Sequence, residues 1–283
     1  MVFPAWGHLL TDDLKFVWWL HSAEGRLYIQ NNSPLFAISA SKRIVDVRNF
    51  IHVLSFLGID GNEVYLVREA TTFSEVILPD PCLIPTDEGD RIWTQEYKTI
   101  ISSLKKSILK EMTSCLPYQN IYFSRTRLDN HRDFGEKYVE EAFRQKGFKI
   151  IYPEEYSIEE QVFLIRNCSC FATTEGSIAH NAIFLDEGKK LILVRKANYI
   201  NPYQIVIDEM QKIETIYVDA HLSFLNNKKV PMIGPFFVYV NRKLATLLQI
   251  PCHFPLWEFL RYIRWSVFHR DILYRIYAKE DKY

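Results

Sequence analysis

Cationic side chains and a glycine turn follow two apolar segments in the middle of the chain. Arg125 and Arg127 alternate at the end of the extended segment NIYFSRTR, so we expect both to face the same way, and Arg132 lies on the following loop. The turn follows the segment SCFAT and consists of Thr174, Glu175, Gly176 and Ser177. Glycine lets the backbone approach a ligand closely, and the amides that open a helix attract anions. Guanidinium groups beside such a turn suit a nucleotide diphosphate, although they could also be plain surface cations.

Three other polar side chains belong to the same predicted cleft. Glu136 lies in the first turn of a predicted helix, where it would complement the helix dipole or bond the ribose or base of a nucleotide. His180 and Asn181 lie one turn into the helix that follows Gly176. Both could line the cleft, although a packed histidine is the commoner arrangement.

A histidine and two acids near the N-terminus form a second candidate group. His8 and Asp12 are four residues apart, which places them on one face of a helix, and Asp13 follows directly. An imidazole and a carboxylate at a helix start could provide a general base, or the acids could simply stabilise the helix N-terminus. Metal ligation is the less favoured interpretation because no DxD-type motif follows an apolar strand.

The elements around these residues predict an α/β fold. Between residues 122 and 184, apolar strands alternate with amphipathic helices, a pattern typical of a parallel, doubly wound sheet. Ligands of such sheets bind outside the carboxyl ends of the strands. Near the N-terminus, the spacing predicts a helix from Leu9 to about His21, and TFSEVILPD is predicted to form a strand.

The length of 283 residues favours more than one domain. We place one α/β domain at residues 1–117 and a second at 118–250. Residues 251–283 are predicted to form a long helix that packs back on both domains. This segment mixes aromatic and basic residues as membrane-surface helices do, but its apolar positions lie on more than one face, so the interpretation favours packing.

Composition limits the classes of function. The 34 basic and 34 acidic residues give no net formal charge, which argues against a general polyanion binder, and we expect no nucleic-acid partner. The five cysteines lack CxxC pairing, as is usual for reduced thiols. Neither a signal peptide nor a stretch of about 20 apolar residues is visible. We therefore expect a cytoplasmic protein, with peripheral contact at the inner face of the plasma membrane as an option.

The stretch YFSRTR…GEKYVEEAFRQKGFKIIYPEEYSIEEQVFLIRNCSCFATTEGSIAHNAIFL resembles the core of glycosyltransferase family 61. The opening GHLLTDDL is similar to the His-Phe-Leu-x-Asp region of that family. The resemblance covers most of residues 6–200. Four residues match family positions: Arg125, Glu136, Gly176 and Asn181. The family's Asn before Glu136 is Gly135 here, and its His-Gly-Ala is Glu175-Gly176-Ser177.

The resemblance implies a GT-B fold, in which two Rossmann-like domains face a central cleft. Residues 1–117 would then form the acceptor-side domain and residues 118–250 the nucleotide-sugar-binding domain. It also implies an inverting glycosyltransferase without a cofactor or an obligatory metal. The partners would be a nucleotide-sugar donor and a glycan or lipid-linked glycan acceptor in the biosynthesis of a bacterial surface polysaccharide such as capsule or lipopolysaccharide. His8, Asp12 or Asp13 would act as the base. The alternative is a catalytically inactive member that binds a sugar nucleotide or a glycan.

Overall fold

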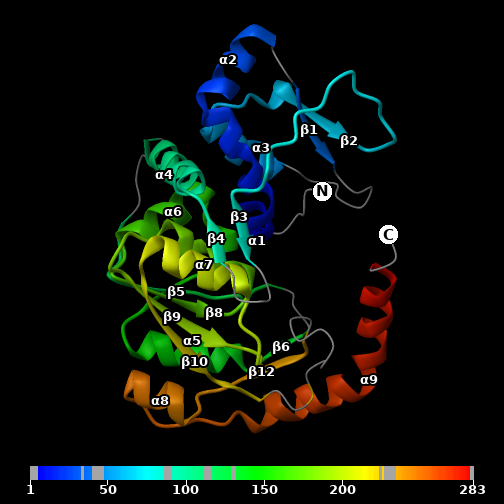
Figure 1. The fold of residues 1–283 in the computed structure, drawn as a ribbon. Helices are drawn as coiled ribbons and strands as arrows, with labels where there is room; N and C mark the ends of the chain where they lie inside the picture. The colour runs from blue at the N-terminus through cyan, green and yellow to red at the C-terminus, as the bar shows by residue number, and fades with distance from the viewer. Residues whose placement is uncertain are drawn as a thin grey trace.

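The computed structural model describes residues 6–32, 35–39, 48–85, 91–110, 116–128, 132–222 and 234–280, together with Met112 and Leu225. A five-stranded parallel sheet forms the centre of the fold (Figure 1). Its strands are β5 (Asn120–Phe123), β7 (Lys149–Ile151), β8 (Cys170–Thr174), β9 (Lys190–Arg195) and β10 (Glu214–Asp219). Their spatial order is β10-β9-β8-β5-β7, and every pairing is parallel. The predicted parallel α/β sheet is confirmed.

The strand order identifies the edge of the sheet where a ligand would bind. The first strand of this sheet in chain order, β5, lies between the sheet's second strand, β7, and its third, β8, so the direction of winding reverses between β5 and β8. In open parallel sheets, the crevice beyond the carboxyl ends at this switch point is the usual ligand site. Arg125 follows β5, and Glu175 and Gly176 follow β8. The switch point therefore brings together the two segments that the sequence singled out.

Helices cover both faces of the sheet, because alternate side chains of each strand point to opposite faces. Phe123 belongs to the core that includes α6, η5 and α7, whereas Tyr122 packs with α5 and α8. These helices are α5 (Glu136–Gln145), α6 (Ile158–Asn167), the 3-10 helix η5 (Ser177–Phe184), α7 (Pro202–Gln211) and α8 (Arg242–Leu248). Ser157 and Glu160 form the capping box at the start of α6.

The region before the sheet is mostly helical. A continuous helical run consists of α1 (Trp6–His8), the π-helical turn η1 (Leu9–Asp13) and the 3-10 helix η2 (Leu14–His21). It is followed by α2 (Ala23–Asn32), β1 (Phe36–Ser39), α3 (Arg48–Phe56), η3 (Gly61–Glu63), β2 (Val64–Val67), β3 (Leu83–Pro85), β4 (Arg91–Trp93) and α4 (Gln95–Lys110). β1 and β2 pair in parallel, and β3 and β4 pair antiparallel. A complete Rossmann-like sheet in residues 1–117 stays a prediction.

One predicted strand in this region is wrong. The segment TFSEVILPD has no strand pairing in the structure. Its side chains Val76 and Leu78 are 68% and 82% exposed. A strand requires a ladder partner and a buried face, and this segment has neither. Its β-branched and apolar residues therefore lie in an extended surface loop.

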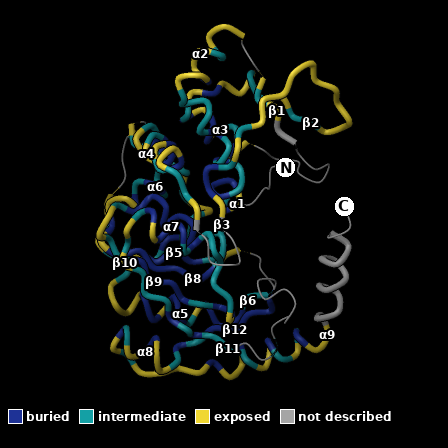
Figure 2. Tube along the Cα trace, viewed as in Figure 1, coloured by how far each residue is buried: buried dark blue, intermediate teal, exposed yellow. Residues whose placement is uncertain are grey.

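The N-terminal region and the sheet share one apolar core (Figure 2). Leu10 of η1 and Leu104 of α4 are fully buried in the same cluster as Phe171 of β8 and Ala182 of η5. α4 packs beside α6, and α1 packs beside η5. This continuous packing fixes the His8–Asp13 segment against the helix that follows Gly176.

A three-stranded sheet and the start of the last helix lie toward the bottom of the view of Figure 1. β12 (Phe236–Val238) pairs with β6 (Asp133–Phe134) in parallel and with β11 (His221–Leu222) in the antiparallel sense. The first half of α9 (Leu256–Glu280) packs on this sheet through Tyr262. Among the helices that the structure describes, none combines the length and apolar character needed to cross a membrane.

Candidate active site

Arg125 and Gly176 meet at the switch point. A Cβ atom placed on Gly176 would lie 3.2 Å from Nη1 of Arg125, so the guanidinium covers the glycine directly. The backbone at Gly176 has φ 130° and ψ −170°, a conformation that side chains with a Cβ rarely adopt. Glycine is needed here for both backbone geometry and space. The predicted pairing of an arginine with the glycine turn is thus present in the structure.

Glu136 connects the three elements that meet at this point. Its Oε1 accepts hydrogen bonds from the Arg125 amide at 3.2 Å and from Oγ1 of Thr174 at 3.2 Å. The side chain is 4% exposed. Burial and the nearby Asp133 raise its pKa, while Lys196 and Arg125 oppose this rise. Glu136 holds β5, β8 and α5 in place, a contribution beyond helix-dipole stabilisation.

Lys196 is a cation of this site that the sequence analysis missed. It directly follows β9, and its Nζ lies 3.2 Å from Oδ1 of Asp133 and 4.6 Å from the centre of the Phe236 ring. Lys196 and Asp133 are both buried, with side chains 5% and 7% exposed. The sequence does contain a signal for this cation, because the apolar segment KLILVRK ends in Arg195 and Lys196, just as the segment before Arg125 ends in cations.

Glu175 faces the same neighbour. Its Oε2 accepts a hydrogen bond from the Lys196 amide at 3.1 Å, which links the ends of β8 and β9. Its Oε1 is buried and has no hydrogen-bond partner among the described residues. Burial raises the pKa of Glu175 to about 7, against the opposing effect of Lys196 and Arg195. Glu175 is therefore an acid that can be neutral or charged near pH 7.

Arg127 does not share the environment of Arg125. Its guanidinium pairs with Glu155 and lies 3.7 Å from the centre of the Tyr152 ring. The chain turns directly after β5, and the Leu128 amide bonds the Arg125 carbonyl at 3.0 Å. Strand alternation ends there, so the expectation that both arginines face the same way is wrong.

Arg132 lies at the entrance to β6. Its carbonyl accepts a hydrogen bond from the Phe236 amide at 2.8 Å, which continues the ladder between β6 and β12. The structure thus places its backbone in the small sheet beside Asp133, next to the buried ion pair of that residue with Lys196.

His8 and Asp12 form a hydrogen-bonded dyad on the N-terminal side. Nδ1 of His8 lies 2.6 Å from Oδ2 of Asp12. Oδ1 of Asp12 accepts a hydrogen bond from Tyr203 at 2.6 Å and lies 3.6 Å from Nζ of Lys15. Tyr203 belongs to α7, so the dyad is completed by a residue 191 positions away in the chain. Tyr203 carries no local signal in the sequence that would predict this contact.

The dyad has the charge properties of a base and its orienting acid. The hydrogen bond to Asp12 raises the pKa of His8 above its ordinary value, against the effect of burial. Burial alone would raise the pKa of Asp12, but hydrogen bonds from His8 and Tyr203 outweigh it, and the pKa lies below its ordinary value. An ionised Asp12 accepts from Nδ1, so Nε2 is the nitrogen that would take a proton.

Asp13 lies outside this hydrogen-bonded group. Its Oδ2 is buried and has no hydrogen-bond partner among the described residues. Burial raises the pKa of Asp13 to about 7. The structure therefore joins His8 and Asp12 by a hydrogen bond, whereas Asp13 acts on the described part of this group only through its charge.

The dyad and the glycine turn meet at one contact. A Cβ atom on Gly7 would lie 2.7 Å from Cβ of Ser177 and 2.8 Å from Nδ1 of His180, so α1 and η5 touch here. A pocket of about 300 Å³ opens beside this contact. It is lined by His8, Thr11, Ser177, His180, Tyr199, Asn201, Pro202 and Tyr203. His8 from the N-terminal group thus lines one pocket together with Ser177 and His180 from the group around the glycine turn.

His180 and Asn181 mainly fix this contact. Nε1 of Trp6 donates to Oδ1 of Asn181 at 2.7 Å, and Nδ2 of Asn181 donates to the Ile178 carbonyl at 3.0 Å. His180 is 5% exposed, and burial lowers its pKa to about 4, which keeps the imidazole neutral at pH 7. His180 lines the pocket, and Asn181 joins α1 to η5 beside it.

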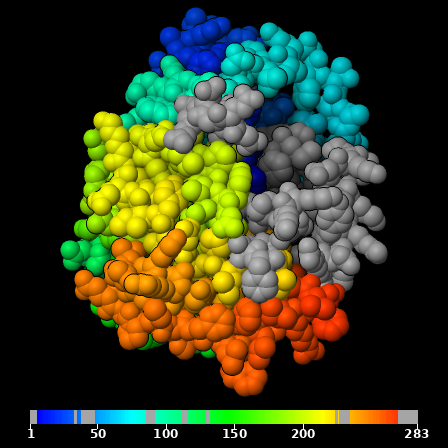
Figure 3. All heavy atoms as spheres, turned by 60° about the horizontal axis from the view of Figure 1, so that its bottom comes forward, coloured from blue at the N-terminus to red at the C-terminus, as the bar shows by residue number. Residues whose placement is uncertain are grey.

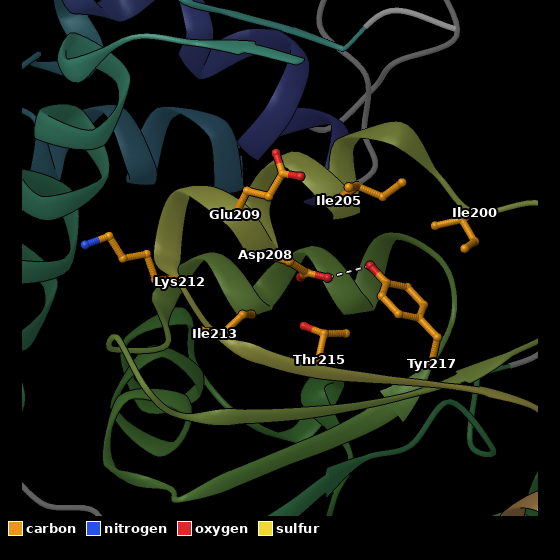
Figure 4. A pocket seen from close by; sticks show the side chains of 8 residues that line it. All are labelled: Ile200, Ile205, Asp208, Glu209, Lys212, Ile213, Thr215 and Tyr217. Carbon is orange, nitrogen blue, oxygen red and sulfur yellow. Dashed lines mark hydrogen bonds between the residues drawn. The ribbon is translucent and has the colours of Figure 1, made fainter. Parts of the chain in front are cut away.

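A larger pocket of about 430 Å³ lies between α7 and the edge strand β10 (Figure 4). Asp208 points into it and accepts hydrogen bonds from Tyr217 and Gln204. The acid is satisfied, and the rest of the lining mixes the apolar Ile205 and Ile213 with the charged Glu209 and Lys212. The lining of this larger pocket contains neither a histidine paired with a carboxylate nor an arginine beside a glycine turn. We therefore assign the chemistry to the smaller pocket. In the described residues, no three His, Cys, Asp or Glu side chains are grouped to hold a metal ion.

Comparison with known proteins gives a family. No curated protein sequence matches the chain. The family model described as Glycosyltransferase 61 matches residues 6–192. This range begins at Trp6, includes the His8–Asp12 dyad and the glycine turn, and ends within β9. Since it covers well over half of the 283 residues, the chain belongs to glycosyltransferase family 61 and is a glycosyltransferase.

Proposed function

We propose that this glycosyltransferase is an inverting enzyme that transfers a sugar from a nucleotide-sugar donor to a glycan or lipid-linked glycan acceptor. The proposed setting is the biosynthesis of a bacterial surface polysaccharide such as capsule or lipopolysaccharide, with the two regions of the chain facing each other in a GT-B-like arrangement. One observation supports this proposal above the others: the contact of Gly7 with Ser177 places the His8–Asp12 dyad beside the glycine turn that Arg125 covers.

The donor diphosphate would bind at the switch point. Arg125 offers a guanidinium beside Gly176, and the amides that open η5 offer the positive end of a helical turn. These donors suit the charge that develops on a departing nucleoside diphosphate, the role that a metal ion fills in other enzymes. The proposal therefore includes transfer without an obligatory metal or cofactor.

His8 would act as the general base, oriented by Asp12. In the reaction, Nε2 of His8 takes the proton from the acceptor hydroxyl, and the hydroxyl oxygen attacks the anomeric carbon of the donor sugar. The bond from that carbon to the diphosphate oxygen breaks as the new glycosidic bond forms on the opposite face. The nucleoside diphosphate leaves with the electron pair, and His8 returns the proton to solvent.

Glu175 would bind a hydroxyl group of the sugar in its neutral form. Its buried Oε1 has no hydrogen-bond partner among the described residues and stands next to the turn. A full charge there would repel a diphosphate, whereas a neutral acid could donate a hydrogen bond to a sugar hydroxyl. With a pKa of about 7, the neutral form is accessible at physiological pH.

A donor screen tests the proposal. The full chain is incubated with UDP-, GDP- and CMP-sugars, with and without a lipid-linked glycan acceptor, and the release of free nucleotide is measured in EDTA and in Mg²⁺. We expect the acceptor to stimulate the release of free nucleotide from one class of donor. The rate should be similar in EDTA and in Mg²⁺. Release that requires Mg²⁺ would contradict the metal-independent mechanism. Nucleotide binding without release from any donor would favour the inactive, sugar-nucleotide-binding alternative.

A further inference from the structure

The start of α9 presents an unusual surface. Leu256, Trp257, Leu260, Val267 and Phe268 have exposed fractions of 57%, 78%, 46%, 70% and 69%. The other exposed side chains between residues 256 and 268 are Arg261 and Arg264. We call these seven residues the α9 surface. No acidic or uncharged polar side chain is exposed between 256 and 268.

The α9 surface is continuous because its residues follow helical spacing. Trp257, Leu260, Arg264, Val267 and Phe268 lie three, four, three and one positions apart, which aligns them along one side of the helix. Figure 3 shows these turns of α9, in orange-red, along the outer rim of the molecule. A row of large apolar side chains of this kind is rare on a surface that faces only water.

The opposite side of α9 is already occupied. Tyr262 is fully buried and packs near the Phe134 and Phe237 rings, with centroid distances of 5.9 Å and 5.6 Å. Ser266 is 3% exposed and donates to the Tyr262 carbonyl at 2.7 Å. The helix is thus anchored through one face, and the α9 surface is not needed for its attachment.

The charges near this surface are predominantly positive. Glu258 is the one acid between residues 256 and 268; it is 7% exposed and bonds both Arg261 at 2.8 Å and Lys137 at 3.0 Å. Arg264 adds a further exposed cation. Cations therefore outnumber acids where the apolar row reaches solvent.

We propose that the α9 surface binds an anionic lipid membrane, with α9 lying in the plane of the interface. A helix that exposes Trp, Phe and Leu together with arginines and without acids fits the boundary between headgroups and acyl chains. The long stems of Arg261 and Arg264 can reach the phosphates while the apolar side chains enter the acyl region. A second copy of this chain would place the same arginines against each other, so the charge pattern favours lipid. This inference does not depend on the proposed sugar donor or mechanism.

Vesicle flotation of the full chain tests the inference. Vesicles of phosphatidylcholine alone are compared with vesicles containing phosphatidylglycerol. We expect binding to the anionic vesicles that weakens as salt is added. The double substitution Trp257→Ala/Phe268→Ala should lower the partition coefficient about tenfold or more. Arg264→Gln should lower it about fivefold, corresponding to about 1 kcal/mol per basic residue near an anionic surface.

Leu78→Ala is the matched control because Leu78 is 82% exposed and lies outside α9. It should leave vesicle binding unchanged. Thermal unfolding of each variant should match the wild type, since the substituted side chains are exposed. The inference is overturned if the wild-type chain floats with neither vesicle, or if Leu78→Ala and Trp257→Ala/Phe268→Ala reduce binding equally. It is also overturned if light scattering shows a dimer that dissociates in the double variant.

Discussion

Both carboxylate oxygens of Asp12 already accept hydrogen bonds in the structure. Oδ2 faces His8, and Oδ1 faces Tyr203 with Lys15 nearby. A carboxylate held in this way, with a lowered pKa, is a poor proton acceptor but a good anchor for an imidazole. At the scale of single residues, the geometry therefore favours His8 as the base and Asp12 as its positioning residue.

The pH profile of transfer separates these two roles. A neutral His8 is the active form, so activity should fall as pH drops through a pKa above 6.5, the ordinary value. Asp12→Asn removes the main cause of the raised pKa, so the acid limb should move to lower pH while kcat falls about a hundredfold. Tyr203→Phe keeps the hydrogen bond between His8 and Asp12, so kcat should fall less than in Asp12→Asn. Asp186→Asn is the control, because this acid pairs with Lys105. If the acid limb of the pH profile does not move in Asp12→Asn, the result would argue against the dyad.

Glu175 should make stability depend on pH. Its pKa is about 7 in the folded chain against an ordinary value of 4.5 for a glutamate carboxyl, so the folded state holds the proton more tightly. The free energy of unfolding should fall as pH rises through this range, by up to about 3 kcal/mol. Glu175→Gln should flatten that fall in urea titrations at pH 5 and pH 8. Glu187→Gln changes an exposed acid and should leave the fall unchanged. If the free energy of unfolding changes equally with pH in both variants, the raised pKa of Glu175 is refuted.

At the scale of elements, the winding reversal between β5 and β8 explains why Arg125 and Gly176 are neighbours although 51 positions separate them in the chain. The glycine conformation keeps the first turn of η5 close to the guanidinium. A side chain at position 176 would strain the backbone and displace Arg125.

Gly176→Ala should therefore weaken binding of the preferred nucleoside diphosphate by tenfold or more and destabilise the fold by about 1–3 kcal/mol. Gly188→Ala is a matched control: Gly188 also has positive φ, at 77°, but a Cβ there meets nothing within 4 Å. It should lower stability by about 1 kcal/mol and leave nucleotide affinity unchanged. Calorimetric titration and urea unfolding measure the two effects. Equal affinities in both variants would exclude a role of the turn in nucleotide binding.

The repeating strands and helices of the sheet could be predicted from sequence, because periodicity and caps such as Ser157 are local signals. The proximity of β5 and β8 followed from the parallel topology. The direction of Arg127 could not be predicted, since it depends on a turn that ends strand alternation. Lys196 was visible only as a strand-ending cation, and Tyr203 reaches Asp12 across the fold without any local signal. The segment containing Val76 shows that strand propensity without a partner does not make a strand.

At the scale of the whole molecule, the N-terminal region and the sheet meet through Gly7. Its absent side chain lets α1 approach η5 so closely that a Cβ would lie 2.9 Å from Cα of Ser177. The Trp6–Asn181 hydrogen bond and the Tyr203–Asp12 hydrogen bond flank this contact. The proposed base, His8, is thus held in place by residues from both regions.

Gly7→Ala should disturb transfer more than nucleotide binding. The added methyl overlaps the Ser177 backbone, so α1 must shift and carry His8 with it, at a cost of about 1–3 kcal/mol in stability. We expect kcat to fall at least tenfold, with the nucleotide dissociation constant within about threefold of wild type. Gly61→Ala, whose Cβ would meet only Ile51 at 3.2 Å, is the control. A parallel loss of nucleotide affinity would mean that Gly7 supports the diphosphate site itself.

The most direct test of the central claim, that a base from the N-terminal region serves a donor bound at the sheet, is the rate of sugar transfer by His8→Ala at saturating donor and acceptor. The dyad predicts a rate about 10²- to 10⁴-fold below wild type, with an unchanged dissociation constant for the donor, since Arg125 and Gly176 are untouched. A rate within threefold of wild type would contradict the account.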